Sequence, residues 1–255
     1  MPHRLLCVTA HPDDESGAFG GALMLAAQAG AETRVLCFTD GQAAHFRGDA
    51  AGNAELGERR RAEMAAACAV LGVTRFEVLH FPDGELAMQD FQEMVAVVVE
   101  QLRRWRPQVV LTFGSDGGVN LHRDHTMIAA VATAAFHWAG RAEMFPEQIA
   151  RGERPHAAQK LYYASTPFVS VRDRPELTGL AATTPWSLTL ELGALADRKM
   201  EAFGKHASQR GVLRRVGEHL HQAMQVERYL LAARRGVSSV TADAGMFAGI
   251  VEGGE

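Results

Sequence analysis

Short apolar runs alternate with longer, mixed stretches along the first two thirds of the chain. Each apolar run has the length of a buried strand and stops at turn-forming residues; the five runs cover residues 5–10, 33–39, 75–81, 109–113 and 160–164. Alanine-rich or amphipathic stretches lie between them and end at glycine or proline, as helices do, at residues 17–30, 56–71, 91–105 and 125–139. The alternation predicts an α/β fold with a mainly parallel sheet and helices on both faces.

The last third of the chain has a less regular pattern. A proline-interrupted, loop-rich stretch precedes two predicted helices, at about 192–208 and 216–233. A Gly- and Ala-rich tail follows, and its apolar patch, Met246–Val251, fits packing, a subunit contact or partial disorder. We expect a single domain over residues 1–255 with three parts: an α/β core at about 4–165, a loop-rich and helical part at about 166–236, and the tail at 237–255.

Composition narrows the class of protein and its partners. The 255 residues are 47% hydrophobic and 22% charged, with a formal net charge of −4, so no basic excess points to nucleic acid or an anionic membrane. The apolar run near the start is too short for a signal peptide, and no stretch is long enough to span a bilayer. We therefore expect a cytoplasmic protein whose three scattered cysteines are buried and reduced.

Two polar motifs occupy equivalent places in this pattern. Residues 10–15, Ala-His-Pro-Asp-Asp-Glu, follow the first apolar run, and residues 122–125, His-Arg-Asp-His, follow the fourth. The carboxyl ends of parallel strands meet at one edge of a sheet, and ligands bind there in open α/β folds. No Gly-x-Gly-x-x-Gly follows the first run, which argues against a dinucleotide enzyme. The sequence predicts an active site at this edge.

The residue types in the two motifs favour metal-assisted hydrolysis. His11 and Asp14 are three residues apart and could point at one divalent cation, with a third ligand from the second motif. The plainer interpretation is that the aspartates cap the following helix. If a metal is bound, Asp13 is placed to act as general base, His122 to stabilise an oxyanion, and Asp124 to orient the His122 imidazole.

The two motifs resemble the signatures of the PIG-L/LmbE-like de-N-acetylase family, which includes deacetylases of glucosaminyl lipid, mycothiol and bacillithiol biosynthesis. The likeness extends over about residues 4–230. Shorter stretches match in order: Thr39-Asp40-Gly41, Arg60-x-x-Glu63, Pro82-Asp83-Gly84-x-Leu86, Leu161-Tyr162-Tyr163 and His206-Ala-Ser-Gln209. The resemblance implies a Rossmann-like α/β sandwich.

The resemblance also implies an activity and a set of residues. It implies removal of an acetyl group from the nitrogen of an amino-sugar conjugate, with Asp13 as general base and His122 stabilising the tetrahedral intermediate. The implied zinc ligands are His11, Asp14 and His125. Three further residues match positions that lie near the sugar or the site in relatives: Arg60, Asp83 and His206. For His206 the alternative is a solvated residue at a helix end.

The second motif departs from the family's usual His-Pro-Asp-His at one position. Arg123 stands where the family has proline, and proline there is stiffening rather than chemical, so the metal interpretation is unaffected. Arg123 either points to solvent or places a cation at the mouth of the site, where it would favour an anionic substrate.

Two other functions compete with a zinc hydrolase. An iron(II) enzyme can use the same two histidines and one carboxylate, although such oxygenases usually adopt double-stranded β-helix folds. A metal- or sugar-binding module without turnover would keep the ligands but has no need of Asp13 and His122. The expected partner is a small amino-sugar substrate, and the family's habit and the apolar tail suggest a homo-oligomer.

Overall fold

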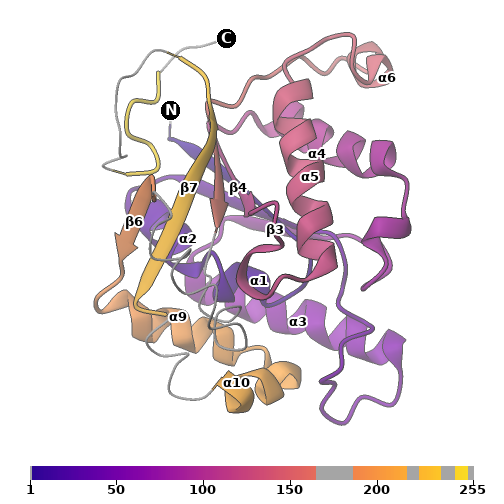
Figure 1. The fold of residues 1–255 in the computed structure, drawn as a ribbon, viewed down its shortest axis with the longest axis vertical. Coiled ribbons are helices and arrows are strands. Elements are labelled where there is room, and N and C mark those ends of the chain that lie inside the picture. The colour runs from indigo at the N-terminus through magenta and orange to yellow at the C-terminus, as the bar shows by residue number, and fades with distance from the viewer. Residues whose placement is uncertain (1, 165–185, 217–223, 237–244, 252–255) are drawn as a thin grey trace.

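The computed structural model describes residues 2–164, 186–216, 224–236 and 245–251, and in these ranges a seven-stranded sheet forms the centre of the fold (Figure 1). The strand order is β3-β2-β1-β4-β5-β7-β6. The strands are β1 (Arg4–Thr9), β2 (Glu32–Cys37), β3 (Arg75–Val78), β4 (Val109–Phe113), β5 (Lys160–Ala164), β6 (Leu188–Glu191) and β7 (Val226–Arg234). Strands β1 to β5 pair in parallel, whereas β7 runs antiparallel to both β5 and β6.

Helices cover both faces of the sheet. The longer helices are α2 (Gly20–Gln28), α3 (Asn53–Leu71), α4 (Phe91–Trp105), α5 (Arg123–Trp138) and α9 (Leu195–Gly204). Helices α4 and α5 pack together as one layer, while α2, α3 and α9 form the other. Short elements complete the described chain: α1 (Asp14–Gly17), α6 (Pro146–Ala150), α10 (Arg210–Val216) and the 3-10 turns η1 (Leu86–Met88), η2 (Gly118–Asn120) and η4 (Ala207–Gln209). The predicted Rossmann-like α/β fold is confirmed.

The central strands are buried on both faces, which explains their continuous apolar sequence. All five residues of β4 are buried, as are the last five of β1. Parallel strands covered by helices on both sides have no solvent face, so they show no polar alternation. Strands β1 and β4 pair directly at the middle of the sheet. The two motifs that follow these strands therefore lie close together.

The predicted helix at 216–233 is wrong. Residues Val226–Arg234 form strand β7, and Leu188–Glu191, predicted as loop, form β6; residues 217–223 and the proline-interrupted stretch at 165–185 lie outside the described ranges. The segment Leu-Leu-Ala-Ala-Arg has high helix propensity. Pairing with β5 and β6 overrides that preference, because tertiary contacts routinely outweigh local propensity.

Strand β7 also anchors the start of α2 through a buried charge. The Glu227 carboxylate accepts hydrogen bonds from the backbone N–H groups of Gly21 (2.7 Å) and Ala22 (2.9 Å) and pairs with Lys199 Nζ at 2.6 Å. These N–H groups are where a nucleotide fold would place a phosphate. The helix start is therefore occupied by the protein's own carboxylate, in agreement with the argument against a dinucleotide enzyme.

The described part of the tail packs on the sheet edge. Met246 is buried, the ring of Phe247 stacks on His3 with centroids 4.8 Å apart, and Val251 exchanges two hydrogen bonds with the side chain of Gln159. Residues 245–251 therefore pack on their own chain, which is one of the three interpretations, and a subunit contact through the same residues stays a prediction.

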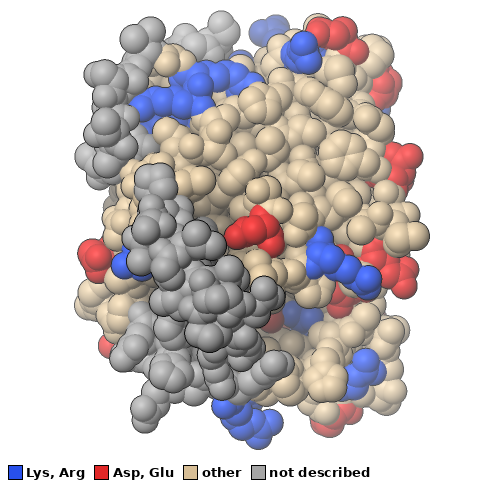
Figure 2. All heavy atoms as spheres, in the orientation of Figure 1, with Lys and Arg blue, Asp and Glu red and all other residues tan. Residues whose placement is uncertain are grey.

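The surface carries charges of both signs. Figure 2 shows basic and acidic side chains scattered over one face, with uncharged surface between them. No helix among the described residues has both the length and the apolar character needed to cross a membrane. All three cysteines, Cys7, Cys37 and Cys68, are buried and unpaired, as predicted.

Candidate active site

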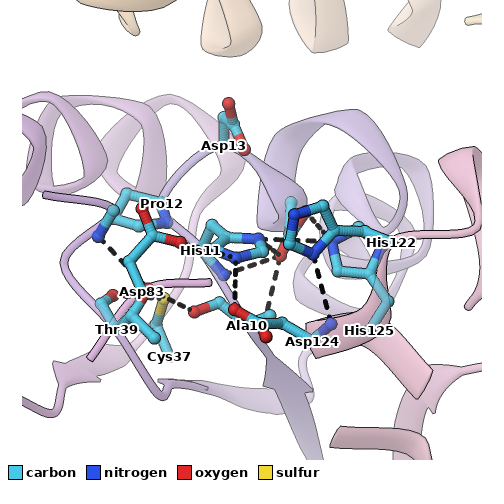
Figure 3. A network of polar contacts seen from close by, with 12 residues as sticks. Ala10, His11, Pro12, Asp13, Cys37, Thr39, Asp83, His122, Asp124 and His125 are labelled. Atoms are coloured by element: carbon cyan, nitrogen blue, oxygen red, sulfur yellow. Dashed lines mark hydrogen bonds and ion pairs between the residues drawn. The ribbon is translucent and has the colours of Figure 1, made fainter. Parts of the chain in front are cut away.

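Both polar motifs lie at the carboxyl edge of the sheet, as predicted. Helix α1 begins at Asp14 immediately after β1, and α5 begins at Arg123 after β4 and the turn η2. His122 occupies the N-cap of α5. The side chains of the two motifs meet in one polar cluster (Figure 3).

Three of the predicted ligand atoms face one another across very short distances. His125 Nε2 lies 3.2 Å from Asp14 Oδ1 and 3.3 Å from His11 Nδ1, and His11 Nδ1 lies 3.6 Å from Asp14 Oδ2. Two ligands of a tetrahedral divalent cation, each about 2.0–2.2 Å from the ion, are about 3.3–3.6 Å apart. The spacing of His11, Asp14 and His125 therefore fits a bound cation.

Hydrogen bonds on the outer side of each imidazole set its tautomer. His125 Nδ1 lies 3.1 Å from the carbonyl of Gly117, so it carries the proton and leaves the Nε2 lone pair towards the cluster. His11 Nε2 lies 3.1 Å from Asp83 Oδ1 and 3.3 Å from Asp124 Oδ2, which leaves the lone pair of Nδ1 facing inward. When the His11 ring is neutral, with its proton on Nε2, the three inward-facing atoms are all lone-pair donors, a set of ligands that suits a divalent cation.

The charges around His11 lead to the same conclusion. Burial lowers the pKa of His11, but hydrogen bonds to Asp124, Asp14 and Asp83 outweigh it and raise the pKa well above the ordinary value. Burial raises the pKa of Asp14, whereas the adjacent His125 and His11 lower it well below its ordinary value. Three carboxylates around one imidazole give this buried cluster a negative excess, which a divalent cation would neutralise.

The backbone prepares one oxygen of Asp14 for ligation. Oδ2 accepts hydrogen bonds from the N–H groups of His11 (2.7 Å) and Ala10 (3.2 Å), so it is already occupied. The other oxygen, Oδ1, is directed at His125 Nε2. The rigid turn after β1 therefore orients the carboxylate before any ligand arrives.

Asp13 sits beside the cluster, with its side chain apart from the His11 ring (Figure 3). Its φ of 118° lies in the left-handed region that non-glycine residues rarely adopt. Arg60 Nη2 lies 3.2 Å from Asp13 Oδ2. Burial raises the pKa of Asp13 to about 6, with Arg60 opposing and the neighbouring Asp14 reinforcing the rise. A carboxylate with such a pKa is suited to take and return a proton near neutral pH.

His122 presents a hydrogen-bond donor to the same space. Its Nδ1 accepts a hydrogen bond from the backbone N–H of Asp124 at 3.2 Å, so Nε2 carries the proton of the neutral ring. Burial, then the neighbouring His11 and His125, lower the pKa of His122. A neutral ring that donates from Nε2 can stabilise an oxyanion. The ligand atoms of His11, His122 and His125 also lie within 4.8 Å of one another, so His122 is close enough to share in holding an ion.

The contact expected of Asp124 is different in the structure. Its carboxylate, fully buried, lies against His11 Nε2 and accepts from the backbone N–H groups of Gly84 (2.7 Å) and Leu86 (3.3 Å), whereas the sequence suggested that it orients the His122 imidazole. Only the backbone of Asp124 bonds to His122. The reason is that the Pro82–Leu86 turn, distant in sequence, brings its N–H groups to this carboxylate.

Arg60 is placed to hold the site together. It is 3% exposed, and its guanidinium donates to the carbonyls of Pro12 and Gly41 as well as pairing with Asp13. Gly41 has a φ of 65° and lies so close to this guanidinium that a Cβ would overlap it. Arg60 therefore fixes the loops after β1 and β2, a role beyond the sugar contact expected of it.

The other three candidate substrate residues differ in exposure. Asp83 accepts from the N–H of Ala43 in addition to contacting His11. His206 is 1% exposed and lies 2.7 Å from Glu15 Oε1, so the solvated alternative for it is wrong. Arg123 is exposed at the start of α5. Of the three, Arg123 alone has the accessibility of a residue at the mouth of the site.

Glu63 was given no role in the sequence analysis, although the Arg60-x-x-Glu63 spacing indicated one. The Glu63 carboxylate accepts from the backbone N–H (2.8 Å) and the hydroxyl (2.7 Å) of Ser208. Glu63 lies one helical turn after Arg60 on α3, so the Arg60-x-x-Glu63 spacing places both side chains on one face. That face joins the first motif to the His206–Gln209 segment.

The sheet and the His/Asp cluster define a Rossmann-like α/β protein with a candidate metal centre. The sequence profile of the PIG-L family, described as GlcNAc-PI de-N-acetylase, matches residues 6–136. A 1D-myo-inositol 2-acetamido-2-deoxy-alpha-D-glucopyranoside deacetylase of Rhodococcus jostii (strain RHA1) is 31% identical over 243 residues, covering 81% of each chain. The chain belongs to the PIG-L family.

Solved structures share the fold at lower sequence identity. N,N'-diacetylchitobiose deacetylase from Pyrococcus horikoshii has a TM-score of 0.69 at 20% identity, covering 89% of this chain and 84% of its own. GalB, a 4-carboxy-2-hydroxymuconate hydratase from Pseudomonas putida KT2440, has a TM-score of 0.71 at 20% identity, with 93% and 99% covered. These likenesses show the fold, whereas the curated relatives support an enzyme that acts on amides.

Proposed function

We propose that this protein is a zinc-dependent hydrolase that removes an N-acetyl group from an N-acetylglucosamine-type conjugate. The observation that carries the proposal is the convergence of three ligand residues: His125 Nε2 lies 3.2 Å from Asp14 Oδ1 and 3.3 Å from His11 Nδ1. Family membership and the deacetylase activity named for the Rhodococcus relative supply the reaction and the substrate class.

A divalent cation held by His11, Asp14 and His125 would supply Lewis-acid polarisation of the amide carbonyl and would lower the pKa of a bound water to about 7. The cluster donors suit zinc, and iron(II) is the alternative because two histidines and a carboxylate also bind it.

Asp13 removes the proton from the attacking water and delivers it to the departing amine nitrogen. Its pKa of about 6 permits both directions of transfer, and Arg60 holds its carboxylate in place. His122 donates from Nε2 to the oxygen that becomes negative in the tetrahedral intermediate. Asp83 and Asp124 hold His11 from outside, which fixes its tautomer throughout.

The fold and the second set of residues weigh against the competing functions. The sheet is largely parallel with helices on both faces, unlike the β-helix of most two-histidine iron oxygenases. A binding module needs no strained aspartate beside its ligands, and Asp13 is both strained and held by a buried arginine. The hydratase shares the fold only, at 20% identity.

Acetate release from a panel of N-acetylglucosaminides tests this proposal. Wild type, chelator-treated wild type and Asp13→Asn are compared, with zinc restored to the treated sample. We expect turnover in wild type, loss with the chelator, recovery with zinc and little turnover in Asp13→Asn. Full activity after verified metal removal would contradict the proposal, as would oxygen consumption or alkene hydration in place of acetate release.

The expected cytoplasmic location and homo-oligomeric state are separate predictions. Cell fractionation tests the location, and light scattering of the purified chain tests the oligomeric state.

A further inference from the structure

A concave region is lined by elements that also contribute residues to the active site. We call it the arginine cavity; its volume is about 610 Å³, within the range of small-molecule pockets. Its lining comes from the loop after β2, from α3, and from η4 and α10: His45 to Asp49, Arg59, Glu63, Ala207, Ser208, Arg210, Gly211 and Arg214. None of these residues belongs to the His/Asp cluster.

The walls of the arginine cavity are joined by specific contacts. Gln209 Nε2 donates to the Phe46 carbonyl at 2.8 Å, which ties the loop after β2 to η4. Gly211 passes so close to the Phe46 ring that a Cβ there would overlap it. Glu63 fixes Ser208 by two hydrogen bonds. Segments more than 140 residues apart in sequence are therefore held together to form one hollow.

The lining carries more positive charge than its own carboxylates neutralise. Four arginines face two carboxylates, and both carboxylates are already engaged: Asp49 pairs with Arg59, and Glu63 binds Ser208. Arg47 donates to the Asn53 amide oxygen, and within the described ranges no carboxylate pairs with Arg47, Arg210 or Arg214. Arg210 and Arg214 are four residues apart on α10, so both present to one side of the helix.

The arginine cavity adjoins the place where catalysis is proposed. Arg59, on its wall, precedes Arg60, which pairs with Asp13, and Glu63 lies one helical turn further along α3. The loop after β2 contacts the site through Gly41 and Ala43 before residues 45–49 line the cavity. The loop after β2 and helix α3 therefore contribute residues to both the proposed active site and the arginine cavity.

We propose that the arginine cavity binds an anionic group, phosphate or carboxylate, on the part of the substrate beyond the amino sugar. The statement that the anion belongs to a substrate rests on the proposed function. The presence of an anion-binding site does not depend on it. Guanidinium groups bind both anions through paired hydrogen bonds. The protein would therefore favour acidic amino-sugar conjugates over neutral ones.

Anion binding is measured first, by calorimetry of the full chain with inorganic phosphate and, separately, with malonate. The variant is Arg210→Ala/Arg214→Ala, and the control is Arg151→Ala/Arg154→Ala, which removes the same charge near α6, far from α10 in Figure 1. We expect the variant to lose affinity by roughly 10–100-fold and the control to bind as wild type does. Equal binding by all three, or no binding by wild type, would overturn the inference; the tighter of the two probes identifies the acid group.

The second measurement compares kcat/KM for methyl N-acetylglucosaminide, N-acetylglucosamine 1-phosphate and an N-acetylglucosaminide of a hydroxy acid. The kcat/KM of the arginine variant should fall by roughly 10–100-fold for the preferred acidic substrate and by less than about threefold for the neutral one. Equal losses on all three would overturn the inference. If no amide is cleaved while anion binding still depends on Arg210 and Arg214, the proposed function fails and the anion site stands.

Discussion

The His/Asp cluster and the arginine cavity lie a few residues apart along α3 and carry opposite excesses of charge. In the cluster, each group has partners: Asp14, Asp83 and Asp124 surround His11, and their charge calls for a cation. In the cavity, arginines exceed carboxylates, and their charge calls for an anion. Under the two proposals made above, the acidic cluster performs the chemistry and the basic hollow selects the substrate.

The two regions also differ in how they are assembled. The cluster depends on two short motifs, each placed by the end of a central strand. The cavity depends on contacts such as Gln209 with Phe46, which join segments 163 positions apart. Substitutions in the cluster should therefore change the chemical step, and those in the cavity should change recognition.

The largest kinetic effect is expected from Asp13→Asn. An amide cannot accept the proton from water, so kcat should fall by roughly 10²–10⁴-fold while KM changes little. Metal content should stay at the wild-type level, because Asp13 is not among the converging ligand atoms. Steady-state kinetics with metal analysis checks this prediction. A large rise in KM with unchanged kcat would show that Asp13 acts in substrate binding, and the proposed difference between the cluster and the cavity would be wrong.

A smaller effect is expected from the carboxylates behind His11. Asp124→Asn should lower metal affinity or activity by roughly 10–100-fold, because an outer hydrogen bond fixes the orientation of a ligand imidazole. Asp83→Asn should cost less, because the Asp124 carboxylate is fully buried and also holds two backbone N–H groups. Metal titration of both variants checks the order, and a greater loss from Asp83→Asn would contradict it.

Glu63→Gln tests the link between the two regions. The buried Glu63 carboxylate accepts two hydrogen bonds from Ser208, and its loss should lower the free energy of unfolding by about 1–3 kcal/mol. Glu58→Gln, at an exposed position of the same helix, is the matched control and should be neutral. Denaturant unfolding measures both; equal stability of the two variants would show that Glu63 does not join the walls.

The smallest effect concerns a histidine outside both regions. Burial lowers the pKa of His156, and the charges of nearby arginines lower it further. A 2.7 Å hydrogen bond to the Pro107 carbonyl opposes this shift only in part. The unfolded chain therefore takes up the proton first, so stability present above the ordinary histidine pKa is lost as pH falls through the lowered value. The difference in unfolding free energy between wild type and His156→Gln, followed with pH, should show this loss; a pH-independent difference would contradict it.

Much of the sheet could be predicted because its signals are local. The limits of β4, β5 and α4 agree with the sequence analysis, since continuous apolar runs and one amphipathic stripe define them. The convergence of His11, Asp14 and His125 was also predictable, because parallel strands place their carboxyl ends at one edge. Strand β7 was missed because its pairing partners lie far away in sequence.

The partner of a buried side chain was harder to predict than its place. Asp124 lies where expected, yet its carboxylate contacts His11 because the turn at Gly84 supplies backbone donors. His206 is buried against Glu15 through a contact spanning 191 positions. Such pairs depend on how distant segments pack, which hydrophobic periodicity does not encode.

Metal content of the purified chain tests the central claim most directly. Wild type, Asp13→Asn and Asp14→Ala are prepared identically without added chelator and analysed for zinc and iron, with circular dichroism to verify folding. The account predicts one ion per chain in wild type and in Asp13→Asn, and none in folded Asp14→Ala. A metal-free wild type, or full occupancy in Asp14→Ala, would contradict the assignment of this cluster as a metal centre.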